Sequence, residues 1–76
     1  MKDRFLTKSL YINGHKTNVG LENGFWDALT EIAAAAHVNV SRLISMIAAL
    51  PQHKNFSSTI RLFVLAYYRN RRNGEA

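Results

Sequence analysis

The chain has 76 residues, a formal net charge of +5 and a pI near 10.1, and this length predicts a single domain. It contains no cysteine, which excludes disulfides and thiolate metal sites. No apolar run approaches the ~20 residues that a membrane-spanning helix needs. A hydrophobic share of 47% favours burial against a second chain. The basic pI favours an anionic partner, either nucleic acid or, more weakly, a membrane surface.

Residues 1–8 are mixed and charged, and we expect them to form a mobile arm. They lack the long apolar stretch and the small-residue cleavage site of a signal peptide. The sequence therefore predicts a cytoplasmic location.

Residues 9–22 predict a β-hairpin, because Asn13-Gly14 separates two β-prone runs and tolerates the positive φ of a two-residue turn. One face would carry the apolar side chains of Leu10, Ile12, Thr17, Val19 and Leu21. The other face would carry Ser9, Tyr11, Lys16 and Asn18. Lysine and asparagine suit base edges and phosphates, although the same alternation describes a half-buried strand with a solvated polar face.

Two helices are predicted next, over residues 23–37 and 41–50. In the first, apolar residues recur at helical spacing from Phe25 onward. Ser41 is the expected N-cap of the second, and Pro51 ends it because the residue before a proline avoids the helical region.

A third helix is expected over residues 57–70, capped by Ser57 or Ser58. So little of its surface is polar that it should be buried, either in the chain's own core or between subunits. Residues 71–76 are expected to form a tail.

The sequence shows no spacing that would bring catalytic side chains together. The five acidic residues are scattered, the three histidines lack metal-ligand spacing, and a Gly-rich phosphate loop is missing. We therefore expect neither an enzyme nor a metal site, and no cofactor.

The basic residues are more informative. Lys8 and Lys16 flank the hairpin, and Arg42 lies in the first turn of the second helix. Free N–H groups and the positive dipole end attract phosphate at that position, while the alternative for Arg42 is a solvated side chain. The arginines at 69, 71 and 72 are interpreted as a solvated helix end.

Strand, helix, short turn and second helix, in this order, resemble the ribbon-helix-helix transcription regulators of the MetJ/Arc/CopG type. The resemblance is carried by residues 16–21 for the ribbon, 25–29 for the first helix and 40–44 for the start of the second. Residues 55–69 resemble a bacterial variant that has an additional C-terminal helix.

The resemblance implies a homodimer in which two ribbons pair antiparallel and enter the DNA major groove. It assigns base contacts to Lys16, Asn18 and position 20, and phosphate contacts to Ser41 and Arg42. Gly20 departs from the pattern because it has no side chain to read a base. Tyr11 shares the outward face and would either stack near DNA or obstruct its approach.

Together with the residue pattern, this resemblance predicts an α+β, mostly helical, ribbon-helix-helix homodimer with an intermolecular antiparallel β-ribbon. Its expected function is that of a bacterial, repressor-type regulator that binds double-stranded DNA, with Lys8 and Tyr11 as additional DNA contacts. The alternative is an adaptor or antitoxin-like dimer whose ribbon face or third helix binds a protein.

Overall fold

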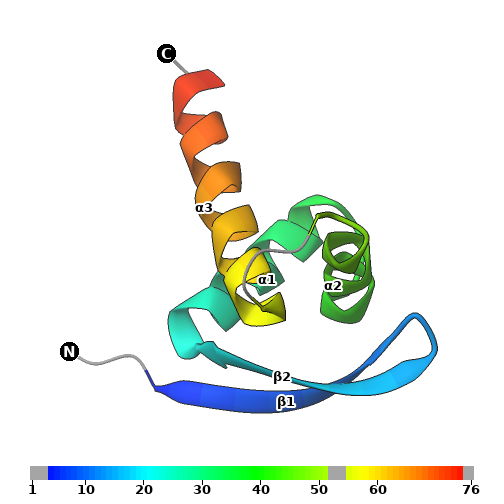
Figure 1. Cartoon of the computed structure of the whole chain (residues 1–76). Helices are drawn as coiled ribbons and strands as arrows, with labels where there is room; N and C mark the ends of the chain where they lie inside the picture. Colours follow the sequence, from blue (N-terminus) through cyan, green and yellow to red (C-terminus); the bar gives the residue numbers. More distant parts are fainter. Residues whose placement is uncertain (1–3, 52–54, 75–76) are drawn as a thin grey trace.

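The computed structural model describes residues 4–51 and 55–74, with side chains described as far as Arg71. A two-stranded antiparallel sheet is followed by three helices (Figure 1). The elements are β1 (Phe5–Ile12), β2 (His15–Glu22), α1 (Asn23–Ala35), α2 (Val40–Ala48) and α3 (Phe56–Gly74). The predicted α+β class is therefore confirmed. The parts of the predicted arm and tail at residues 1–3 and 75–76, and the side chain of Arg72, lie outside the described residues.

The hairpin turn follows the prediction. Asn13 and Gly14 have φ angles of 54° and 84°. A two-residue hairpin turn of type I′ requires positive φ at both of these positions. The turn fixes the pairing of the strands, which brings Tyr11 opposite Lys16 and Ser9 opposite Asn18. This pairing puts Ser9, Tyr11, Lys16 and Asn18 on one face, as the sequence predicts.

Strand β1 begins at Phe5, so the predicted arm is wrong over residues 5–8. These residues continue the ladder, with Phe5 opposite Glu22 and Lys8 opposite Val19. Helix α1 anchors the start of the strand, because the Trp26 indole N–H donates a hydrogen bond to the Leu6 carbonyl at 3.0 Å. The sequence prediction considered the segment alone, whereas its partner strand and α1 stabilise it.

All three helices lie on one side of the hairpin (Figure 1). The inner face of the sheet contributes Ile12, Val19 and Leu21 to the core, as the alternation predicted. The helices contribute the remaining buried apolar residues, which are Trp26, Leu29, Ile32, Ala33, Leu43, Ile44, Ile47, Ile60 and Val64. The hairpin is thus covered on one face and open on the other.

Helix α1 ends at Ala35, two residues before the predicted end. His37 adopts a positive φ of 60°. Its N–H donates to the Ala34 carbonyl at 3.1 Å, and the Val38 N–H donates to the Ala33 carbonyl at 3.0 Å. These are the two bonds of a Schellman motif, in which glycine usually occupies the left-handed position.

We expect His37→Gly to stabilise the protein. A residue with a Cβ is strained in the left-handed region by roughly 1–2 kcal/mol, and the greater freedom of glycine in the unfolded chain offsets part of the gain. The net increase in unfolding free energy should be about 0.5–1 kcal/mol. Urea denaturation measures it, with His37→Ala as the control that keeps the strained Cβ. Equal midpoints for the glycine and alanine variants would contradict the expectation.

Helix α2 is capped by Asn39, which corrects the predicted Ser41 cap. Asn39 has an extended backbone, and its Oδ1 accepts a hydrogen bond from the Arg42 backbone N–H at 2.7 Å. Ser41 therefore lies inside the first turn. The helix spans Val40–Ala48, against a prediction of 41–50.

Helix α3 begins one residue before the predicted 57–70 and continues to Gly74, so the predicted tail is wrong over residues 71–74. Its first turn is capped by Asn55, whose Oδ1 accepts from the Ser58 N–H at 2.8 Å. Its first half packs on the core through Ile60 and Val64. Its second half extends beyond the other helices (Figure 1). The predicted burial is confirmed only for the face that carries Ile60 and Val64, because Leu62, in the same half of the helix, is 46% exposed. In the described part of the chain, no helix is long and apolar enough to cross a membrane.

Candidate nucleic-acid interface

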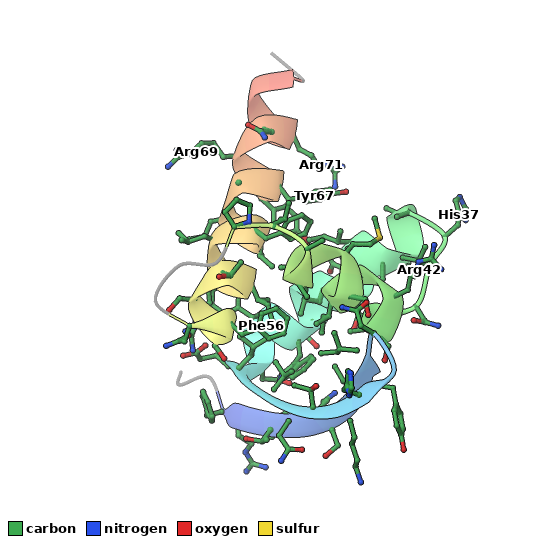
Figure 2. All side chains as sticks on the ribbon, turned by 45° about the vertical axis from the view of Figure 1, so that its right-hand side comes forward. His37, Arg42, Phe56, Tyr67, Arg69 and Arg71 are labelled. Carbon is green, nitrogen blue, oxygen red and sulfur yellow. The ribbon has the colours of Figure 1, made fainter. Side chains whose placement is uncertain are left out.

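The open face of the hairpin carries the predicted base-reading residues. Lys16 and Asn18 are exposed on β2, and Ser9 and Tyr11 are exposed opposite them on β1. Side chains on this face project away from the helices (Figure 2). The helices pack on the other face, so the open face is an exposed surface that is supported from behind.

Asn18 is oriented by its cross-strand neighbour. The Ser9 hydroxyl donates to Asn18 Oδ1 at 2.7 Å. An amide oxygen can accept two hydrogen bonds and the amide nitrogen donates two more. The contact therefore fixes the side chain and still leaves it the donor and acceptor that adenine recognition requires.

Gly20 is covered by an aromatic ring from the neighbouring strand. A Cβ built at Gly20 would lie 2.7 Å from Phe5 Cζ, 2.8 Å from Phe5 Cε2 and 3.3 Å from Thr7 Oγ1. Phe5 is nevertheless 57% exposed. The ring occupies the space in which a side chain at position 20 would project.

Lys8 lies on the opposite face from Lys16. It pairs with buried Val19, and its ammonium stands 5.0 Å from the centre of the Trp26 ring. A cation over an indole face is attracted by the ring's electrons. The structure therefore separates Lys8 from the predicted contact residues on the open face, while Tyr11, 68% exposed, stays beside Lys16.

A second basic position lies at the start of α2. Arg42 is exposed and Ser41 is half-buried. His37, Val38, Asn39 and Arg42 line a shallow hollow between α1 and α2, and Figure 2 shows the His37 and Arg42 side chains beside each other. The Arg42 backbone N–H is used by the cap, so its guanidinium is the group available to a phosphate.

The arginine-rich end of α3 lies far from both positions. Arg69 and Arg71 project to opposite sides of the second half of the helix, at the end far from the hairpin (Figure 2). The Arg71 guanidinium stands 5.8 Å from the centre of the Tyr67 ring. These side chains are not part of the hairpin surface.

The start of α3 fixes the Gly20–Glu22 end of β2. The Ser57 hydroxyl donates to the Gly20 carbonyl at 2.8 Å. Arg61 Nε and Nη2 donate to Glu22 Oε1 and Oε2 at 2.9 and 3.3 Å. The hydrogen bonds from Arg61 lower the pKa of the Glu22 carboxyl below its ordinary value. Helix α3 thus anchors the strand that carries the candidate contacts.

We expect the Glu22–Arg61 pair to contribute a pH-dependent part of the stability. A carboxyl whose pKa is lowered on folding stabilises the native state above its ordinary pKa, and the contribution is lost as the pH falls through the lowered value. Both side chains are partly exposed, so the effect should be modest. Denaturation midpoints of wild type and Glu22→Gln should differ at neutral pH and converge in acid. In the Glu22→Gln background, Arg61→Gln should add no pH dependence. A difference between the midpoints of wild type and Glu22→Gln that stays the same at every pH would contradict the assignment.

Comparisons with known protein families and solved structures agree with this architecture. Residues 5–68 match the sequence model of a family described as ribbon-helix-helix domain, which indicates a non-catalytic, regulatory fold and confirms the resemblance drawn from the sequence. Among solved structures, an uncharacterized protein from Bordetella pertussis Tohama I is similar, with a TM-score of 0.78 and 32% identity. The match covers 96% of this chain and 62% of that chain. Among curated proteins, no significantly similar relative is found.

Sequence reasoning missed Phe5 as a surface residue of the hairpin. It lay in the predicted arm, although Phe5 and Thr7 continue the alternation of Ser9 and Tyr11. That period of two was the available signal.

Proposed function

Because this chain belongs to the family of ribbon-helix-helix domains, which generally bind DNA and dimerise, we propose that it is a sequence-specific regulator of transcription that binds double-stranded DNA as a homodimer. The observation that carries the proposal is the open face of the hairpin, which presents Lys16 and Asn18 on a strand anchored from behind. Lysine donates to guanine, and asparagine pairs bidentately with adenine in the major groove. The proposal includes a repressor-type role in the bacterial cytoplasm.

The free edge of β2 supports the dimer. In a two-residue hairpin the residues next to the turn exchange backbone hydrogen bonds, so Lys16, Asn18 and Gly20 direct their backbone groups to the other edge. A partner's β2 can pair there. The Gly20 carbonyl already accepts from Ser57, and a carbonyl can accept a second bond. Pairing would bring two Lys16–Asn18 rows side by side.

Such a dimer has four strands, with the two β2 strands in the centre. Strands about 4.8 Å apart place the outer pair about 14 Å from each other, whereas the major groove is about 12 Å wide. The central strands would therefore enter the groove, and the β1 strands would lie at its rims. Tyr11 would face the backbone from there, while Lys8 is left out because it lies beside Trp26 on the inner face.

The proposal assigns phosphate contact to Ser41 and Arg42 at the start of α2, where the helix dipole favours an anion. Charge adds to this attraction, since two chains of +5 each give a dimer of +10. Such binding weakens steeply with salt, because each neutralised phosphate releases counterions.

The test is fluorescence polarisation with genomic and random duplexes at several salt concentrations. Wild type should bind with an affinity that falls linearly on a double-logarithmic plot. Arg42→Ala should weaken binding evenly across sequences and reduce the slope by about one per lost contact. Arg69→Ala, which removes the same charge at the far end of α3 (Figure 2), should leave the slope unchanged. Failure of wild type to bind any duplex at low salt would overturn the proposal.

Exposed apolar residues on α3 favour a second candidate, an adaptor or antitoxin-like dimer that binds a protein. Leu62 and Leu65 are 46% and 57% exposed. Beside them, a hollow is lined by Leu50, Pro51, Thr59, Leu62, Phe63 and Ala66. An adaptor should bind no duplex in the salt series, which separates the two candidates.

A further inference from the structure

The outer face of the hairpin carries one large apolar ring at a position of the proposed base-reading row. Lys16, Asn18 and Gly20 follow each other on the outward face of β2, and the row ends with a residue that has no side chain. The Phe5 ring lies over this residue, with two of its carbons within 2.8 Å of the point where a Cβ would stand. Phe5 comes from β1, yet its ring leans over β2.

We propose that Phe5 reads the C5 methyl group of thymine, an inference that rests on the DNA-binding function proposed above. The major-groove edges of the bases present hydrogen-bond donors and acceptors, and the thymine methyl is the apolar group among them. A phenyl ring in line with Lys16 and Asn18 offers that methyl an apolar partner. The row then reads a purine, a purine and a thymine through three different chemistries.

The exposure of the Phe5 ring indicates that it is not part of the core. Phe5 is 57% exposed, whereas the adjacent Leu6 packs against the core on the inner face. Exposure of an apolar ring to water is unfavourable, and contact with a base removes the ring surface from water.

The absence of a side chain at Gly20 leaves the space that the Phe5 ring occupies. A glycine in a strand often marks a close approach by another group. Any Cβ at this position would overlap the ring, so Gly20 and Phe5 act together. Removing the ring and displacing it are therefore two independent ways to test the same contact.

The test begins with the duplex that wild type selects from a random pool. Each thymine is replaced in turn by deoxyuridine, which keeps the base pair and lacks the methyl. For wild type, one thymine in each half-site should give about fourfold weaker binding when replaced, as expected for the loss of one buried CH₂-sized group. For Phe5→Ala, the thymine and deoxyuridine duplexes should bind equally. Leu65→Ala should keep the wild-type ratio, because it truncates a side chain that is also 57% exposed but lies on α3.

Gly20→Ala gives the second arm. It retains Phe5 but forces the ring aside, so the thymine-to-deoxyuridine ratio should fall toward one. Trp26 fluorescence reports whether β1 remains docked in each variant, since this single tryptophan donates to the Leu6 carbonyl. If Phe5→Ala unfolds the hairpin, the test rests on Gly20→Ala alone. A thymine-to-deoxyuridine ratio for Gly20→Ala that equals the wild-type ratio would then overturn the inference.

The outcomes separate the two proposals. Selective binding by wild type that is insensitive to deoxyuridine at every thymine overturns the role of Phe5 and leaves the DNA-binding function intact. Selective binding with a ratio that survives in both Phe5→Ala and Gly20→Ala also overturns it. Absence of selective binding by wild type overturns the function and the inference together.

Discussion

A lysine in place of Val19 is expected to prevent the chain from folding. Val19 is 2% exposed and faces the core from the inner side of β2. An unpaired ammonium buried there costs several kcal/mol, and Lys8 directly opposite adds repulsion. Small domains have only about 5–15 kcal/mol of stability in total. Far-UV circular dichroism of Val19→Lys should lack the native helix signal and a cooperative thermal transition.

The matched control is Asn18→Lys. It introduces the same residue one position earlier, where the side chain is exposed on the outer face. This variant should keep the native spectrum and unfold cooperatively. If the two variants behave alike, the assignment of the two faces of β2 is wrong.

The hairpin shows what the sequence was able to predict. Asn13-Gly14 determines the turn, the turn determines the register, and the register assigns every side chain of the strands to one of two faces. Each step follows from local geometry. That is why the open face with Lys16 and Asn18 could be assigned before any contact between distant residues was known.

The extension of β1 could not be predicted in this way. Phe5 and Leu6 form a strand because β2 continues to Glu22 and because Trp26, twenty residues away in sequence, bonds the Leu6 carbonyl. The same extension places Lys8 on the inner face and the Phe5 ring over Gly20. These contacts depend on tertiary packing, so a reading of the segment alone missed them.

The helix caps were ambiguous for a different reason. Asparagine and serine are nearly equivalent as N-caps, and asparagines precede the predicted serine caps of both α2 and α3. The structure selects Asn39 and Asn55. The shift matters for the candidate site, because it moves Arg42 to the third helical position and engages its backbone N–H in the cap.

Replacement of both Lys16 and Asn18 by alanine is expected to abolish selection of a DNA sequence. Each good contact of a side chain with a base edge contributes roughly 1–3 kcal/mol of discrimination, and a dimer would lose both contacts in each half-site. Attraction to phosphate would remain through Arg42 and the general positive charge, so binding should persist at low salt without sequence preference. Both side chains are exposed, and the fold should therefore be retained.

In-vitro selection from random duplexes provides the measurement, with wild type and the double variant in parallel. Wild type should enrich a palindromic or near-palindromic motif, because two rows related by a two-fold axis read the same bases in each half-site. The double variant should enrich none, while its circular dichroism stays native. Arg69→Ala with Asn70→Ala is the matched control, since it removes one basic side chain and one amide from exposed positions of α3, and it should enrich the wild-type motif. Enrichment of that motif by the Lys16/Asn18 variant, or of none by wild type, would favour the protein-binding adaptor instead.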